Sequence, residues 1–199
     1  TFYYVMEHLE GETLDKLVEA RGAMPVGLAL HILKQVCAAL QEAHGRGLVH
    51  RDIKPHNIML CQRGGERDVV KILDFGLVKD VHGRQSRDIT QFQRMIGTPL
   101  YMAPEQMRNP ADADARSDVY SVGAVAFYLL TARDLFERAG EHDLTYHILH
   151  TPARRLADLV PGISRRLDDL VARCLAKDRA ERPHDILVVL ALLEAAAGE

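Results

Sequence analysis

The chain has few cysteines, and the three that it has do not form a recognisable framework. Cys37, Cys61 and Cys174 are odd in number and show no Cys-x-x-Cys spacing. Disulfide-rich secreted domains and zinc modules carry even, closely spaced sets of cysteines. The pattern therefore favours a reduced, cytoplasmic compartment and argues against a disulfide scaffold or a zinc site.

The chain also has no large excess of positive or of negative charge. The 25 lysines and arginines are balanced by 28 aspartates and glutamates, which leaves a formal net charge of −3. Proteins that attract nucleic acid or anionic membranes through a general positive field need a clear excess of basic residues. The composition therefore predicts no nucleic-acid partner.

No hydrophobic run is long enough to cross a bilayer. The longest, from Val119 to Ala132, is interrupted by polar residues and a glycine, whereas a spanning helix needs about 20 apolar residues. We interpret it as a buried helix and expect no membrane segment in this chain, although a longer protein could be anchored elsewhere. Because the first residue is Thr1 and no signal peptide is visible, we expect the natural N-terminus to lie upstream.

What the sequence does contain is mostly helical periodicity. Apolar residues recur at helical spacing in six segments: 13–20, 25–44, 118–131, 143–149, 164–175 and 183–196. Pro25 and Pro183 are expected in the first turns of their helices, and Ser164 is expected to cap its own. Short strands are predicted at 58–60 and 69–73, joined by a turn at Gly64-Gly65, and a further strand at 1–6. The fold class is therefore α+β, mainly helical, with a small β-hairpin.

Chemically active side chains are concentrated in the loop 50–57 and the turn 74–76. They supply one carboxylate (Asp52), one ammonium (Lys54), one amide (Asn57) and a second carboxylate (Asp74). Aspartate and asparagine oxygens suit Mg²⁺, which takes its remaining ligands from water and phosphate. A carboxylate can accept a proton from a hydroxyl, and a lysine can neutralise a migrating phosphoryl group. The pattern is therefore consistent with phosphoryl transfer.

These two motifs, in this order and joined by a hairpin, resemble the catalytic loop and the Asp-Phe-Gly motif (Asp74, Phe75, Gly76) of protein kinases. The similarity continues through segment 97–105, which resembles the end of an activation segment, and through the helix beginning at Asp118. The residues of the catalytic loop and the start of the next strand (50–60) and of segment 97–106 are most similar to those of bacterial Ser/Thr kinases. The resemblance implies a protein-kinase-like fold, ATP and Mg²⁺ as cofactors, protein substrates and a signalling role.

The resemblance also assigns roles to single residues. Asp52 would orient or deprotonate the substrate hydroxyl, and Lys54 would contact the γ-phosphate. Asn57 and Asp74 would hold the Mg²⁺ ions that bridge ATP oxygens. Asp118 would accept hydrogen bonds from the backbone near His50 and Arg51.

Four further residues would surround the adenine ring. Met6 would be the gatekeeper, the backbone of Glu7 and Leu9 would pair with the adenine edge, and Met59 would form the floor of the pocket. Methionines also commonly fill irregular gaps in hydrophobic cores. A core role for Met6 and Met59 therefore remains open.

The activation segment would be anchored and switched by separate residues. Glu105 and Arg182 are expected to form a buried ion pair. Thr98 would bond Asp52 and Lys54 as the substrate-docking threonine. Arg51 directly precedes the catalytic aspartate and can bind an anion. A phosphate group on the activation segment is therefore expected to order that segment. Thr90, eight residues before Thr98, is the expected phosphorylation site and Ser86 the second choice, with autophosphorylation between two copies as a possible route.

Several parts of the family pattern differ or are missing. We expect 1–199 to be a partial kinase domain, with 1–9 as the last strand and hinge of the N-lobe and 10–199 as the C-lobe. The glycine-rich loop and the phosphate-pairing lysine are absent, so this fragment alone is expected to be inactive. His56 stands where kinases that favour basic substrates often carry a glutamate. The segment 132–136 replaces the usual Gly-x-Pro-Pro-Phe.

Two other functional classes share part of this pattern with an active Ser/Thr kinase. A pseudokinase scaffold would have no need to keep Asp52, Lys54, Asn57 and Asp74 together. A small-molecule kinase would share an aspartate loop, but segment 97–105 and the position of Lys54 favour a protein substrate. Lys54 also favours Ser/Thr over Tyr substrates.

Overall fold

A computed structural model describes residues 7–74, 99–136 and 141–196. The helices are α1 (Leu14–Arg21), α2 (Val26–Gly45), α4 (Pro104–Arg108), α5 (Ala115–Thr131), α6 (Glu141–His150), α7 (Arg165–Cys174) and α8 (Ile186–Ala196). The strands are β1 (Gly11–Thr13), β2 (Ile58–Arg63) and β3 (Glu66–Ile72), and short 3-10 turns lie at Pro55–Asn57, Pro110–Asp112 and Leu156–Asp158.

The three strands form one antiparallel sheet in the order β1-β2-β3. The predicted turn is confirmed: Gly64 and Gly65 have φ angles of 58° and 87°, which glycine adopts at little cost. β1 was not predicted, because three residues carry no strand periodicity. Gly11 makes it possible, since a Cβ there would lie 2.4 Å from the carbonyl oxygen of Leu60. The observed sheet thus has one strand more than the expected two-stranded hairpin.

Helix α5 forms the centre of the hydrophobic core, as the apolar run 119–132 predicted. It packs against α2, α7 and α8, and its residues from Ser117 to Phe127 are all buried. Gly123 permits the contact with α7, because a Cβ there would lie 2.7 Å from the Cβ of Cys174. The helix begins at Ala115, three residues before the predicted start, where the Asp114 carboxylate accepts a 2.8 Å hydrogen bond from Arg116 N.

One predicted helix start is corrected by the structure, and another is confirmed to within one residue. Pro183 does not lie in the first turn of α8, because that helix begins at Ile186. The carboxylate of the preceding residue, Asp185, accepts a 2.9 Å hydrogen bond from Val188 N. Pro25 is the residue before the first turn of α2. The Ser164 cap is confirmed, since its hydroxyl accepts a bond from Leu167 N at 3.2 Å.

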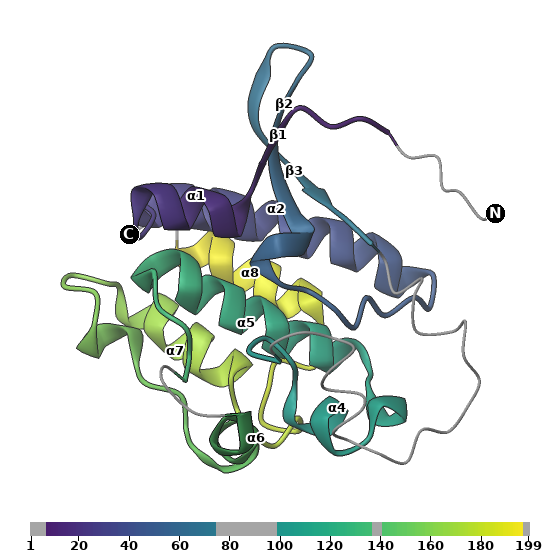
Figure 1. The fold of residues 1–199 in the computed structure, drawn as a ribbon, viewed down its shortest axis with the longest axis vertical. Coiled ribbons are helices and arrows are strands. Elements are labelled where there is room, and N and C mark those ends of the chain that lie inside the picture. Colours follow the sequence, from purple (N-terminus) through teal and green to yellow (C-terminus); the bar gives the residue numbers. More distant parts are fainter. Residues whose placement is uncertain (1–6, 75–98, 137–140, 197–199) are drawn as a thin grey trace.

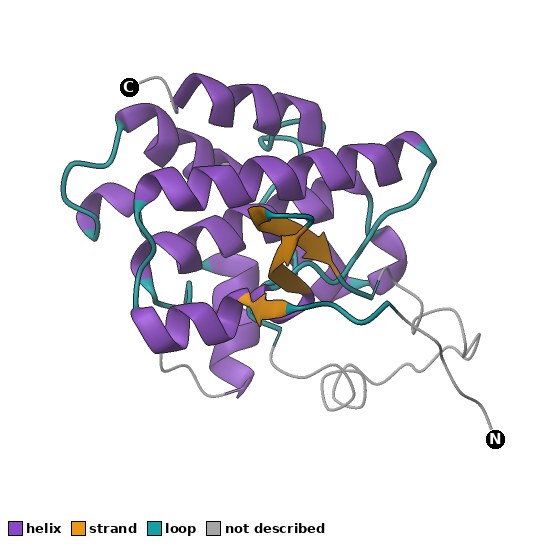
Figure 2. Ribbon diagram, turned by 90° about the horizontal axis from the view of Figure 1, so that it is seen from above, coloured by secondary structure: helices purple, strands orange, loops and turns teal. Residues whose placement is uncertain are grey.

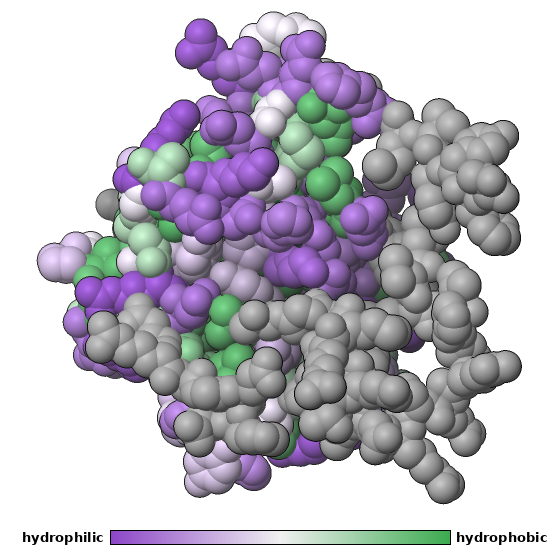
Figure 3. All heavy atoms as spheres, in the orientation of Figure 1, coloured by the Kyte–Doolittle hydropathy of each residue, from purple (hydrophilic) through white to green (hydrophobic). Residues whose placement is uncertain are grey.

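The sheet stands at one end of the molecule and rests on the helices (Figure 1). Helices α4 and α6 lie at the opposite end, and α2 runs beneath the strands in the view from above (Figure 2). Hydrophilic side chains predominate on the face drawn in Figure 3, with hydrophobic residues in small groups between them. None of the described helices is both long and apolar enough to cross a membrane.

Candidate active site

The loop after α2 is fixed from below by Asp118 of helix α5. One carboxylate oxygen of Asp118 accepts a hydrogen bond from His50 N at 2.9 Å, and the other accepts one from Arg51 N at 2.8 Å. Asp118 is completely buried. A third donor, the Nε2 of His44 in the last turn of α2, lies 2.8 Å from the same carboxylate. The two backbone contacts are those expected from the sequence.

This anchoring holds a backbone conformation that is unfavourable in itself. Arg51 has a φ angle of 67°, and Asp74 has one of 52°. Side chains other than glycine rarely adopt positive φ, and each such residue costs on the order of 1–3 kcal/mol. At Arg51, the hydrogen bond from its N–H to Asp118 helps to hold this conformation.

Asp52, Lys54 and Asn57 form one polar cluster on the loop. Asp52 Oδ2 lies 3.0 Å from Lys54 Nζ and 3.0 Å from Asn57 Nδ2. Asn57 Nδ2 also donates to the backbone oxygen of Asp52 at 2.9 Å. Because both partners of Asn57 are acceptors, its amide nitrogen must face them and its carbonyl oxygen must face away.

The end of strand β3 is tied to the same loop, which brings Asp74 beside it. His50 Nε2 donates to the backbone oxygen of Leu73 at 3.1 Å, and Leu73 N donates to the backbone oxygen of Asn57 at 2.8 Å. His50 is fully buried and Asp74 is exposed. The loop and the strand end are therefore one hydrogen-bonded unit.

The oxygen atoms of this unit suit Mg²⁺. The carbonyl oxygen of Asn57 faces away from Asp52, and the Asp74 carboxylate is open to solvent. Both are hard donors, and two protein ligands are sufficient for an ion that keeps waters and binds phosphate oxygens. The donor set therefore fits the predicted metal.

A small hollow lies directly beside the cluster. Its lining residues come from the loop, from segment 99–102 and from α5: Arg51, Asp52, Ile53, Lys54, Pro99, Tyr101, Met102 and Ser121. The Ser121 hydroxyl donates to the backbone oxygen of Tyr101 at 2.7 Å, which fixes segment 99–102 against α5. A hydroxyl group entering this hollow would reach Asp52.

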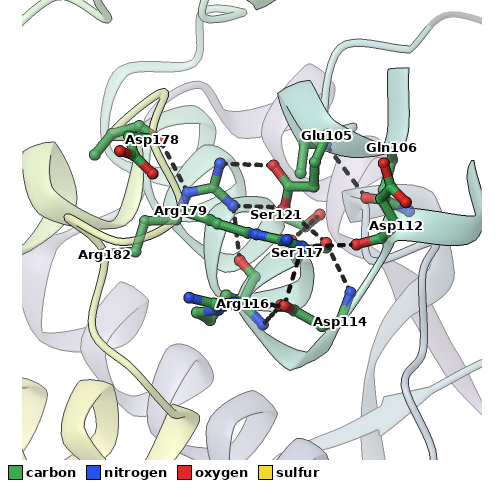
Figure 4. A network of polar contacts seen from close by, with 12 residues as sticks. Glu105, Gln106, Asp112, Asp114, Arg116, Ser117, Ser121, Asp178, Arg179 and Arg182 are labelled. Atoms are coloured by element: carbon green, nitrogen blue, oxygen red, sulfur yellow. Dashed lines mark hydrogen bonds and ion pairs between the residues drawn. The ribbon is translucent and has the colours of Figure 1, made fainter. Parts of the chain in front are cut away.

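The segment that follows is anchored by a buried ion pair. Arg182 donates to both carboxylate oxygens of Glu105, at 2.7 and 2.8 Å, and the Ser117 hydroxyl donates to Glu105 at 2.7 Å (Figure 4). Burial opposes the charged form of Glu105, but the hydrogen bonds and charge of Arg182 outweigh it and lower the pKa of this carboxyl. The contact expected between Glu105 and Arg182 is thus present.

His56, which departs from the family pattern, is exposed and pairs with Asp15 of helix α1. Its Nδ1 lies 3.0 Å from Asp15 Oδ2. Burial disfavours the charged form of Asp15, but its hydrogen bonds, including that with His56, outweigh burial and lower the pKa of Asp15. A negative charge from another helix therefore lies next to the position where the usual glutamate is missing.

The remaining expected site residues fall into two groups. Glu7 is exposed, Leu9 is half-buried, and Met59 is half-buried in β2 opposite Lys71 of β3. The others lie outside the described residues: Met6, Phe75, Gly76, Ser86, Thr90 and Thr98.

Two polar residues of this region were missed by the sequence interpretation. His44 contacts Asp118 across 74 positions of the chain, and no local pattern indicates such a contact. Gln106 donates to the backbone oxygen of Arg51 at 3.1 Å. Its place two residues after Pro104 is typical of the first turn of a helix and could have indicated its bond with Ala103 N, but no local pattern indicates the bond to Arg51.

Known proteins that resemble this chain are protein kinases. Residues 1–191 match the family described as "Protein kinase domain". The Ser/Thr-protein kinase PknL of Mycobacterium tuberculosis is 39% identical over 197 residues, which are 99% of this chain and 47% of PknL. Pkn1 of Myxococcus xanthus is 39% identical over 99% of this chain and 28% of its own. The chain therefore spans about half, or less, of the length of these curated relatives.

Solved kinase structures share the fold. The PknI kinase domain of Mycobacterium tuberculosis aligns with a TM-score of 0.71 and 26% identity, over 96% of this chain and 64% of that chain. Rad53 residues 1–466 in complex with AMP-PNP aligns with a TM-score of 0.73 and 28% identity, over 93% of this chain and 44% of that chain. The curated relatives PknL and Pkn1 are bacterial Ser/Thr protein kinases. With the family match covering almost its whole length, the chain belongs to the protein kinase domain family.

Proposed function

We propose that the protein containing this chain transfers the γ-phosphoryl group of ATP to serine and threonine hydroxyls of protein substrates. The observation that carries the proposal is the cluster of Asp52, Lys54 and Asn57 on a loop that Asp118 fixes from below. Phosphoryl transfer depends on positioning and on charge neutralisation, which a rigid polar cluster can provide.

Each residue has a distinct task in this proposal. Asp52 orients the acceptor hydroxyl and takes its proton, while Lys54 neutralises charge on the phosphoryl group in transit. Asn57 and Asp74 would hold Mg²⁺. When bound, Mg²⁺ supplies positive charge that stabilises the phosphate oxygens.

We further propose that residues 1–9 form the last strand and hinge of the N-lobe and 10–199 the C-lobe. Met6, Glu7, Leu9 and Met59 would then line the adenine site. This assignment is supported by the resemblance of the motifs and by the binding of AMP-PNP to the related Rad53 structure. On this assignment residues 1–199 lack the phosphate-covering loop, and the fragment is inactive by itself.

The test is a phosphotransfer assay with the full-length protein, labelled ATP and a mixed Ser, Thr and Tyr peptide library. We expect incorporation into serine and threonine only, and its complete loss when EDTA removes Mg²⁺. Residues 1–199 alone should give no signal in the same assay. Label on tyrosine, transfer that persists in EDTA, or robust activity of the fragment would each contradict the corresponding part of the proposal.

Regulation is proposed to act through phosphorylation of Thr90, with Ser86 as the second candidate. The proposal rests on the position of Arg51 directly before Asp52 and on the distance of eight residues between Thr90 and Thr98. A phosphate adds nearly two negative charges and can form about one to three charge-assisted hydrogen bonds with a basic side chain.

The Thr90→Ala variant of the full-length kinase should therefore lose most of its activity, about tenfold or more if one such contact of ~1.4 kcal/mol is lost. Ser86→Ala is the matched control and should retain most activity. Phosphopeptide mapping of the active enzyme should find the phosphate on Thr90. Mixing an inactive Asp52→Asn copy with an active one tests transfer between copies, because only transfer between copies labels the inactive protein. A fully active Thr90→Ala variant would refute the assignment.

A further inference from the structure

Gln106 of helix α4 is buried and joins two stretches of backbone. Its Nε2 donates to the backbone oxygen of Arg51 at 3.1 Å, and its Oε1 accepts from Ala103 N at 3.3 Å. The side chain is 3% exposed. One glutamine thus caps α4 and holds the loop that carries the proposed catalytic aspartate.

The atom that Gln106 holds belongs to the strained residue of that loop. Arg51 has a φ angle of 67°, so its peptide groups relax to another conformation unless they are held. Asp118 holds the N–H side of Arg51 at 2.8 Å, and Gln106 holds the carbonyl side. That carbonyl belongs to the peptide bond leading directly into Asp52. A change in its direction would therefore turn the Asp52 carboxylate away from the hollow.

The residue next to Gln106 is the buried anchor Glu105. Glu105 is fixed by Arg182 and Ser117 through three hydrogen bonds of 2.7 to 2.8 Å. Two neighbouring positions of a five-residue helix therefore face two different structures. Glu105 contacts the C-terminal part of the domain, and Gln106 contacts the catalytic loop. Movement of α4 would be transmitted to Arg51 through the Gln106 side chain.

We propose that Gln106 is a positioning residue that couples the anchored helix α4 to the catalytic loop by holding the Arg51 carbonyl. The inference rests on the proposed kinase function, since it assigns the reacting carboxylate to Asp52. Gln106 itself does not touch the reacting groups. Its removal lowers kcat and leaves KM for ATP unchanged.

The test variant is Gln106→Glu. The new carboxylate can still accept from Ala103 N, but it cannot donate to Arg51 O until it is protonated. Burial beside a carbonyl oxygen raises the pKa of this introduced carboxyl. Gln106→Met is the second variant, since it lacks a donor at every pH.

Gln35 provides a matched control elsewhere in the fold. Its Nε2 donates to Asp68 O at 2.8 Å and its Oε1 accepts from Val70 N at 3.0 Å, on the hairpin side of α2. Gln35→Glu therefore removes the same kind of hydrogen bond without touching the catalytic loop. It reports the effect of such a change away from the catalytic loop, including the contact of Gln35 with His31 at 2.9 Å.

For the full-length kinase we expect kcat of the Q106E variant to fall on the order of tenfold to a hundredfold at neutral pH, as for a small misplacement of a reacting group. The ratio of its kcat to that of the wild type should rise as the pH falls from about 8 to 5, where a buried carboxyl takes up its proton. Dividing the kcat of Q106E by that of the wild type removes the contribution of the titratable groups that both proteins share. These groups are His44, His50, Asp52, Glu105 and Asp118. Q106M should show a similar loss with no acid recovery, and Q35E should show little loss.

A second measurement does not depend on activity. Amide hydrogen exchange of the full-length protein should be faster in residues 50–54 of Q106E and Q106M than in the wild type, and unchanged there in Q35E. Unchanged exchange in 50–54, or an activity loss in Q106E that equals that of Q35E, would overturn the inference. An inactive wild type would instead refute the proposed function, while the exchange result still decides the role of Gln106.

Discussion

Replacement of Asp52 by asparagine in the full-length protein is expected to lower kcat by about 10²- to 10⁴-fold, the usual contribution of a positioned base. The asparagine has nearly the same shape, and its carbonyl oxygen can keep the contacts that Lys54 Nζ and Asn57 Nδ2 make with Asp52 at 3.0 Å. The loop should therefore remain folded. Because Asp52 acts on the acceptor hydroxyl, the affinity for ATP should change little.

Steady-state kinetics and a direct nucleotide-binding titration together test this expectation. Asp158→Asn is the matched control, since Asp158 is an exposed carboxylate of a 3-10 turn away from the loop. It removes the same charge and should leave kcat within about twofold, as expected for a surface change. Near wild-type turnover of the Asp52 variant would show that this residue is not the base.

Loss of Arg182 should have the largest effect on stability. Besides its two bonds to Glu105, Arg182 donates to the backbone oxygens of Ala176, Arg116 and Lys177 at 2.8, 3.0 and 3.2 Å. Arg182→Met would leave the Glu105 carboxylate buried without its cation. Breaking a buried pair in this way costs on the order of 3–5 kcal/mol in the free energy of unfolding.

Urea unfolding at constant pH measures this cost, and an exposed pair supplies its control. Arg46 and Glu42 lie 2.7 Å apart with side chains 70% and 67% exposed, so Arg46→Met should cost under about 1 kcal/mol. Adding Glu105→Gln to Arg182→Met should recover part of the loss, because it removes the stranded charge. A loss in Arg182→Met no larger than in Arg46→Met would contradict the assignment of this pair as the anchor.

The same pair predicts a pH dependence with a definite sign. The pKa of Glu105 is lower in the folded protein than its ordinary value, so the unfolded chain takes up its proton first as the pH falls. The stabilisation is therefore complete above the ordinary carboxyl pKa of about 4.3 and is lost at lower pH. The difference in stability between the wild type and Arg182→Met should shrink over that range.

The local sequence was sufficient for features that depend on neighbouring residues. The turn at Gly64-Gly65 follows from the tolerance of glycine for positive φ, and the Ser164 cap follows from one hydroxyl beside an apolar helix. The burial of helix α5 follows from a run of mostly apolar residues from Val119 to Ala132. The family motifs were recognisable because Asp52, Lys54 and Asn57 lie within six positions of each other. The turn, the helix cap, the buried helix and the motifs could therefore be predicted from composition and spacing alone.

The family resemblance implied that Asp118 holds that loop, but only the tertiary structure showed which other distant residues support it. Gln106 of α4 donates to the backbone oxygen of Arg51, and His44 of α2 contacts the Asp118 carboxylate that holds residues 50 and 51. Strand β1 pairs with β2 across a long interval of chain. A single sequence carries no periodic signal for such contacts, because they depend on how the helices pack rather than on local propensity. The sequence by itself determined the chemistry of the site, whereas the packing of α2, α4 and α5 decided how a strained backbone is kept in the conformation that places Asp52.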